Sequence, residues 1–274
     1  MQVSLATAPG SADKPNEDFA AATPAVAIVL DGVTQRAGLD TGCSHDAHWY
    51  VSQLGPRLLS HATQQPGSHL TAALAASIEE VAALHSATCD LTHPGSPAAA
   101  VAILREQPSA IEYLVLADCV LLADGPGGLH LISDDRVENV AQDERRATQN
   151  EPTGSPVHSR LMRQLVTEQQ RRRNQPGGYW VAAGNPEAAN HAITGTWPQK
   201  EIQRVAILTD GASRLVDLFA LADWPELLDQ LQHNGPGSVI HDVRQAENSD
   251  PDGCRWPRYK RSDDATAAYC QLTS

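Results

Sequence analysis

Two apolar segments far apart in the chain end in the same way, with an aspartate followed by a glycine. The first, AVAIVLDG, ends at Asp31-Gly32, and the second, RVAILTDG, ends at Asp210-Gly211. β-Branched and aliphatic runs of this length are typical of buried strands. Asp-Gly by itself indicates only a turn, because Asp bonds to the nearby backbone and Gly accepts positive φ. Two predicted strands that each end in a carboxylate suggest a site at a sheet edge.

Further acidic residues stand near the ends of predicted strands: Glu17 and Asp18 in PNEDF, Asp118 in LADCV, and Asp263 and Asp264 in SDDAT. If these carboxylates converge, they repel one another, and buried like charges must protonate or share a cation. All-oxygen ligation favours hard divalent ions such as Mg²⁺ or Mn²⁺. Two such ions would lower the pKa of a bridging water and present hydroxide to a phosphorus centre. The other interpretation is a set of unrelated turns in a structural domain.

Composition limits the remaining classes of function. The chain has 274 residues, of which 41% are hydrophobic, so we expect a single domain over residues 1–274. A formal charge of −13 and only 4% aromatic residues argue against nucleic-acid binding. The chain lacks a leader-like start and an apolar run of the roughly 20 residues that span a bilayer, so we expect a cytoplasmic monomer without membrane contact.

The five cysteines are scattered and show no C-x-x-C spacing, which indicates neither a disulfide framework nor a zinc knuckle. His45, Asp46 and His48 invite a metal or acid–base interpretation. At helical spacing, however, they share a face only in part, and exposed side chains are the favoured interpretation.

The hydrophobic pattern predicts strands linked by hairpins, with helices between them. Helices are predicted over 43–61, ended or kinked by Pro56, and over 68–88, where Leu84 joins the buried face. Residues 142–177 are polar, and Arg171, Arg172 and Arg173 favour a solvated helix followed by a loop. A short helix is predicted at 185–193. Strands are predicted at 2–7, 25–30, 98–104, 112–118, 119–132 (a hairpin), 178–183, 204–209 and 265–272.

The order of the acidic motifs resembles that of the type 2C metal-dependent protein phosphatases, the PPM family, in a divergent, bacterial-like form. The motifs are N-E-D, apolar-D-G, apolar-x-D before a hairpin, L-T-D-G-A-S-R-L-V-D and D-D-A-T, and they run from Glu17 to Thr266. This resemblance implies an α+β fold in which two antiparallel sheets form a β-sandwich flanked by helix pairs, a four-layer α/β/β/α arrangement. It also implies a metal cluster in a cleft at one end of the sandwich.

The resemblance further implies two Mn²⁺ or Mg²⁺ ions, and a third, weaker ion as in bacterial members. Asp31 would bridge the two main ions and so take part directly in catalysis, and the Gly32 carbonyl would ligate one of them. The remaining implied ligands are Asp210 and Asp263 for the first ion, Glu17 and Asp18 for the second, and Asp118 with Asp210 for the third.

This chain departs from the family pattern where the phosphate is held. Val33 occupies the position of a histidine often proposed as general acid, and Lys14 stands near the usual phosphate-binding arginine. We expect Lys14 or Arg36 to contact the phosphate, although both also fit ordinary surface charges. A second basic group adjoins Asp263 and consists of Arg255, Arg258, Lys260 and Arg261.

The resulting hypothesis is a metal-dependent phosphatase that hydrolyses phosphomonoesters by a hydroxide held between two ions. Phosphoserine or phosphothreonine in a protein is the favoured substrate, and a small phosphorylated metabolite is an alternative. The altered phosphate-binding positions keep a further alternative open, a catalytically weak or inactive domain that binds or regulates a phosphorylated partner.

Overall fold

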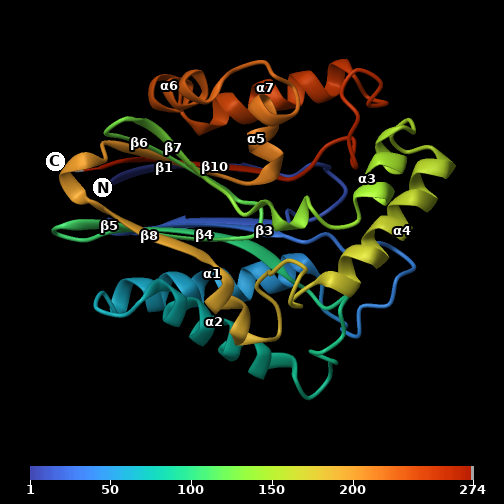
Figure 1. Ribbon diagram of the computed structural model, residues 1–274, viewed down its shortest axis with the longest axis horizontal. Coiled ribbons are helices and arrows are strands. Elements are labelled where there is room, and N and C mark those ends of the chain that lie inside the picture. Colours follow the sequence, from blue (N-terminus) through green and yellow to red (C-terminus); the bar gives the residue numbers. More distant parts are fainter. Residues whose placement is uncertain (273–274) are drawn as a thin grey trace.

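The computed structural model describes residues 1–272 and contains two five-stranded antiparallel sheets packed face to face (Figure 1). The first sheet, in the order β1-β10-β9-β6-β7, consists of Gln2–Ala8, Ala265–Gln271, Arg204–Leu208, Val120–Gly125 and Gly128–Ile132. The second sheet, in the order β2-β3-β4-β5-β8, consists of Asp18–Ala22, Val26–Gly32, Ala99–Glu106, Ala110–Leu116 and Ile193–Pro198. The expected β-sandwich is therefore present.

Helices cover both outer faces, so that four layers lie on top of one another (Figure 1). Helices α1 and α2 pack on the second sheet, α5, α6 and α7 pack on the first, and α3 and α4 lie across one end of the sandwich. Their bounds are α1 Ala47–Gln64, α2 Leu70–His85, α3 Gln142–Gln149, α4 Pro156–Arg172, α5 Asp210–Asp217, α6 Trp224–Asn234 and α7 Pro236–Ser249. Short 3-10 helices occupy Asp135–Val137, Pro186–His191 and Gln199–Glu201.

Strand alternation divides the core into three layers. In β3, Val29 faces the other sheet, whereas Ile28 and Leu30 face α1 and α2. In β9, Ile207 faces the other sheet and Leu208 faces the outer helices. Both strands are apolar on both faces because each sheet is covered on both sides. This explains why the two Asp-Gly motifs follow continuous apolar runs.

The structure corrects several element predictions. Residues 178–183 form only isolated bridges, and strand β8 takes the place at the sheet edge. Helix α1 continues through Pro56 to Gln64, and Leu84 is exposed at the end of α2. Arg173 is buried, and its guanidinium donates to the Ser96 carbonyl at 3.0 Å. Arg171 and Arg172 are exposed, as predicted.

Within the described residues, no helix combines the length and apolar character needed to cross a membrane.

Candidate active site

The acidic residues of β2 and β3 point between the two sheets because of strand alternation. Asp31 lies on the same face as Val29, and Asp18 lies on the same face as Ala20. The register of the two strands places Asp18 directly opposite Asp31. Two carboxylates from neighbouring strands therefore enter the interior at one end of the sandwich.

The second Asp-Gly motif meets the first from the opposite sheet. Asp210 is the first residue of α5, immediately after β9, and its backbone N–H donates to Asp31 Oδ2 at 3.4 Å. Both glycines allow close backbone approach, and neither has positive φ. A Cβ on Gly32 would lie 2.4 Å from the Glu17 carbonyl oxygen, and one on Gly211 would lie 1.9 Å from that of Asp264. Each motif thus packs tightly against the residue that precedes a neighbouring strand, Glu17 before β2 or Asp264 before β10.

A cavity of about 180 Å³ opens where these segments meet. Five of the predicted ligands line it, namely Asp31, Gly32, Asp118, Asp210 and Asp263. Arg36 also lines it, while Met162 and Leu165 of α4 close one wall. The helix that crosses the end of the sandwich therefore forms one side of the cavity.

Three of these carboxyl groups have raised pKa values. Burial raises the pKa of Asp31 well above its ordinary range, and the charges of Asp18 and Asp210 add to the effect. Burial, followed by the charge of Asp210, raises the pKa of Asp118 to about 7. Burial and the charge of Asp263 raise the pKa of Asp210. Such a site has an excess of negative charge that a bound cation would relieve.

Glu17 and Asp18 are the two predicted ligands that, within residues 1–272, lie outside the cavity lining. Asp18 Oδ2 accepts from the hydroxyls of Thr209 at 3.0 Å and Thr266 at 2.7 Å, yet burial still raises its pKa to about 8. Glu17 accepts from the Thr34 hydroxyl. Within residues 1–272, neither carboxylate lines the cavity, so their ligation of an ion, directly or through water, stays a prediction.

Asp264 holds this arrangement together from the strand β10 side. Its carboxylate accepts from the backbone N–H of Gly10 at 2.7 Å and of Glu17 at 2.6 Å. Asp264 therefore fixes the segment that leads into the N-E-D motif. Its neighbour Asp263 lines the cavity.

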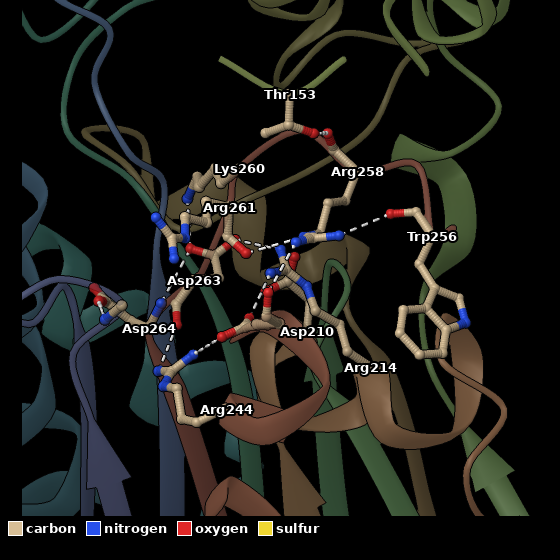
Figure 2. A network of polar contacts seen from close by, with 12 residues as sticks. Thr153, Asp210, Arg214, Arg244, Trp256, Arg258, Lys260, Arg261, Asp263 and Asp264 are labelled. Atoms are coloured by element: carbon tan, nitrogen blue, oxygen red, sulfur yellow. Dashed lines mark hydrogen bonds and ion pairs between the residues drawn. The ribbon is translucent and has the colours of Figure 1, made fainter. Parts of the chain in front are cut away.

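Asp263 differs from the other carboxylates because two cations contact it. Arg214 donates to Asp263 Oδ2 at 2.7 Å, and Lys260 donates to Oδ1 at 2.6 Å (Figure 2). Burial alone would raise the pKa of Asp263, but these two charges outweigh burial and hold the pKa at about 2. Asp263 is therefore ionised and already paired.

The basic residues named from the sequence have different environments. Arg36 lines the cavity, and the one hydrogen bond of its side chain within residues 1–272 is a long contact of 3.5 Å with the Tyr259 carbonyl. Lys14 is exposed and, within the described chain, lies outside the cavity lining. Arg258 is buried, and its guanidinium donates to the Trp256 carbonyl at 3.0 Å (Figure 2) and also to Asp250 Oδ2 at 3.0 Å. Arg255 stacks over Trp256 with 4.0 Å between its guanidinium carbon and the ring centroid.

Sequence reasoning missed two groups that shape the site. Arg214 stands inside the quoted TDGASRLVD motif, so its proximity to the aspartates could have been inferred from one helical turn of separation from Asp210. Glu247 of α7, which pairs with Arg214 at 3.3 Å and with Arg244 at 2.8 Å, gave no sequence signal.

The donor set fits divalent cations. The cavity presents carboxylate oxygens, the chemistry that Mg²⁺ and Mn²⁺ prefer. Burial and neighbouring carboxylates raise the pKa of Asp31 and Asp210, so their ionised forms are disfavoured without a cation. The pairing of Asp263 with Arg214 and Lys260 competes with such an ion.

Comparison with known proteins identifies the group to which this geometry belongs. The family model described as "Protein phosphatase 2C" matches residues 10–238. The chain belongs to the protein phosphatase 2C family. The match includes every predicted ligand except Asp263, which lies beyond its end. No curated protein sequence matches this chain.

Solved bacterial phosphatases share the fold of this protein phosphatase 2C member. The serine/threonine phosphatase PstP/Ppp of Mycobacterium tuberculosis is 15% identical with a TM-score of 0.58, covering 100% of this chain and 99% of that one. Stp1 of Staphylococcus aureus is 9% identical with a TM-score of 0.59, covering 100% and 95%. A PstP catalytic domain solved with two manganese ions is 14% identical with a TM-score of 0.56, covering 100% and 98%.

Proposed function

We propose that this protein phosphatase 2C member is a metal-dependent phosphomonoesterase that acts on phosphoserine or phosphothreonine in proteins. The observation that carries the proposal is the cavity at the end of the sandwich, where Asp31, Asp118 and Asp210 lie together with raised pKa values. Burying like charges without a counter-ion is costly, so their presence together is best explained by cation binding.

Asp31, the Gly32 carbonyl, Asp210 and Asp263 would hold the principal ions, with Glu17 and Asp18 behind them and Asp118 at a third position. When bound, divalent ions lower the pKa of a coordinated water and neutralise charge on phosphate oxygens. The two manganese ions in the related PstP structure support two sites here. Whether Mn²⁺ or Mg²⁺ is used follows from availability more than from this ligand set.

The protein's own residues position the phosphate. In the described part of the chain the Arg36 guanidinium lines the cavity and makes one long hydrogen bond, so its other donors are available for non-bridging phosphate oxygens. Lys260 adds a fixed positive charge at the same cavity. Val33 also lines it, so residue 33 supplies no imidazole to protonate the leaving alkoxide.

A direct test is an assay of p-nitrophenyl phosphate, phosphopeptides and phosphorylated metabolites with Mn²⁺ or Mg²⁺. We expect turnover that chelator abolishes and Mn²⁺ restores. Preference for phosphopeptides would support the protein-substrate proposal, and preference for metabolites would replace it. Undiminished turnover in excess chelator would overturn the metal-dependent mechanism.

One observation favours a second candidate, a domain that binds a phosphorylated partner with little turnover. Asp263 is already neutralised by Arg214 and Lys260, which weakens its attraction for an ion. This candidate predicts that a non-hydrolysed phosphopeptide complex forms, measured by calorimetry, while turnover stays at background at saturating Mn²⁺. A single-domain, monomeric and cytoplasmic protein also remains our proposal, and gel filtration tests the monomer.

A further inference from the structure

Four side chains that have no part in the carboxylate cavity converge at the C-terminal end of α2. Cys43 and His45 come from the segment before α1, His85 is the last residue of α2, and Cys89 follows it. One ligand atom from each of the four lies within 4.8 Å of all the others. These residues are C-x-H and H-x3-C pairs separated by about 40 residues, which is why the sequence pattern did not reveal them.

Three sulfur–nitrogen separations in this cluster match those of a tetrahedral site. Cys43 Sγ lies 3.5 Å from His45 Nδ1 and 3.4 Å from His85 Nδ1, and Cys89 Sγ lies 3.5 Å from His45 Nδ1. Bonds of about 2.3 Å to sulfur and 2.0 Å to nitrogen at tetrahedral angles give sulfur–nitrogen edges of about 3.5 Å. The two sulfur atoms are 3.0 Å apart, closer than the ~3.7 Å edge expected around an ion.

The surroundings favour ligation over a solvated cluster. His85 is 3% exposed, and its Nε2 has no hydrogen-bond partner in the described structure, so Nδ1 carries its polar interactions. The Trp49 ring stacks on His45 with 4.0 Å between centroids and shields one side. The His45 backbone N–H donates to Cys43 Sγ at 3.4 Å, a contact that stabilises a thiolate.

We propose that Cys43, His45, His85 and Cys89 bind one structural Zn²⁺ ion. Two thiolates and two imidazoles form the ligand set that selects zinc, whereas hard Mg²⁺ and Mn²⁺ prefer oxygen. Four protein ligands complete the tetrahedron and leave no position for substrate, so the ion has a structural role. The proposal is independent of the phosphatase activity.

Zinc here would fix the segment that carries Arg36. Residues 33–46 contain no helix or strand, and they are tied to the segment after α2 by the Asp90 N–H bond to the Gly42 carbonyl at 2.8 Å. A metal that joins residues 43 and 45 to residues 85 and 89 removes much of the conformational freedom of this loop. The ion would thereby hold one wall of the cavity in place.

A disulfide between Cys43 and Cys89 is the competing explanation, because the two sulfur atoms are in contact. The two states differ in their chemistry. Disulfide formation releases two protons and two electrons to an oxidant, leaves both histidines unligated and binds no metal. Zinc binding releases protons without oxidation and requires both thiols as thiolates.

The first experiment measures metal in the purified chain without added zinc, using the Asp31→Asn variant alongside the parent. Asp31→Asn weakens the carboxylate site, so zinc retained by both proteins belongs to the Cys/His cluster. We expect one zinc per chain in each. Replacement by Co²⁺ should give the d–d bands of tetrahedral cobalt and a thiolate charge-transfer band. Absence of zinc, together with an intact mass lacking the two thiol hydrogens, would establish the disulfide and overturn the proposal.

The second experiment uses Cys43→Ser and His85→Ala, with Cys254→Ser as the matched control because Cys254 is exposed and outside the cluster. We expect both cluster variants to lose stoichiometric zinc and the control to retain it. Because a cluster variant could unfold, zinc release from the parent by a mercurial reagent is followed in parallel and should occur once the thiols are titrated. Zinc retained by both folded cluster variants, or release unrelated to thiol titration, would contradict the assignment.

Discussion

The carboxylate cavity and the Cys/His cluster are both candidate metal sites, but they differ before any metal binds. Cys43, His45, His85 and Cys89 bring their ligand atoms within 4.8 Å, whereas the carboxylates form no such compact set within residues 1–272. Thiols and imidazoles contact one another without a metal. Carboxylates repel, and they lower this repulsion by binding protons, threonine hydroxyls or cationic side chains.

This contrast indicates different tasks. A site that is assembled without its ion binds tightly and serves structure, as proposed for the Cys/His cluster. A site of mutually repelling carboxylates exchanges its ions and substrate more readily. Its negative charge acts on any ligand that binds there. Arg36 connects the two, because it lines the cavity and belongs to the same segment, residues 33–46, as Cys43 and His45 of the cluster.

The largest expected effect comes from Asp31→Asn. Loss of a carboxylate that we propose as a metal ligand should reduce kcat/KM by about 10³-fold, equivalent to about 4 kcal/mol in the barrier. Zinc content should not change, because the cluster shares no ligand with the cavity. Steady-state kinetics and metal analysis of the same preparation check both statements. Loss of zinc together with activity would show that the two sites are not independent.

Next in size is Arg36→Ala. If Arg36 holds phosphate, kcat/KM should fall by roughly 10- to 100-fold while Mn²⁺ affinity stays nearly constant. Arg171→Ala is the matched control, because Arg171 is exposed on α4 and pairs with Glu168 on the same helix. An unchanged KM for Arg36→Ala would transfer the role to Lys260, or to Lys14 by movement of its exposed segment.

A smaller effect is expected from Lys260→Met, which tests competition at Asp263. Removing the ammonium at 2.6 Å frees Asp263 Oδ1 for an ion, so Mn²⁺ affinity should rise by about tenfold, or about 1.4 kcal/mol. Calorimetric Mn²⁺ titration measures this directly. If the affinity falls instead, Lys260 organises the site and does not compete for it. Lys200→Met, far along the chain in a short 3-10 helix, controls for the general loss of charge.

The cavity could be anticipated from the sequence because its residues follow strands. A carboxylate that follows a buried run must emerge at the strand end, and Asp31 and Asp210 do so in the structure. The order of the motifs then indicated the sandwich and its helix layers. Strand β8 was missed because ITGTWP lies at a sheet edge and lacks a buried apolar run.

The Cys/His cluster could not be anticipated in this way. Its two pairs come together only because α1 and α2 pack against each other on the second sheet, bringing the segment before α1 to the end of α2. The burial of Arg173 and the continuation of α1 through Pro56 have the same origin, since tertiary contacts outweighed the local preference. Local patterns predict elements, and packing decides which distant residues meet.

The smallest predicted effect separates the two sites by pH. Without divalent ions at the cavity, Asp18 and Asp118, with folded-state pKa values of about 8 and about 7, keep protons that the unfolded chain releases near pH 4. The folded state therefore binds more protons between those values, and stability falls as pH rises through that window. Asp263, with a pKa of about 2, acts oppositely, but only in acid.

We expect the Tm of the zinc-loaded protein without Mn²⁺ to fall by roughly 3 °C per pH unit from about pH 5.5 to 8. Adding Mn²⁺ should flatten this slope, because the ion favours ionised carboxylates, and Asp118→Asn should reduce it. The Cys/His cluster contributes the opposite slope, since thiolate ligation weakens as protons compete at low pH. Comparing the parent with Cys43→Ser isolates that contribution: the variant should lose stability more steeply as pH rises. A Tm that increases with pH in metal-free Cys43→Ser would show that the cavity carboxylates are not the protonated groups.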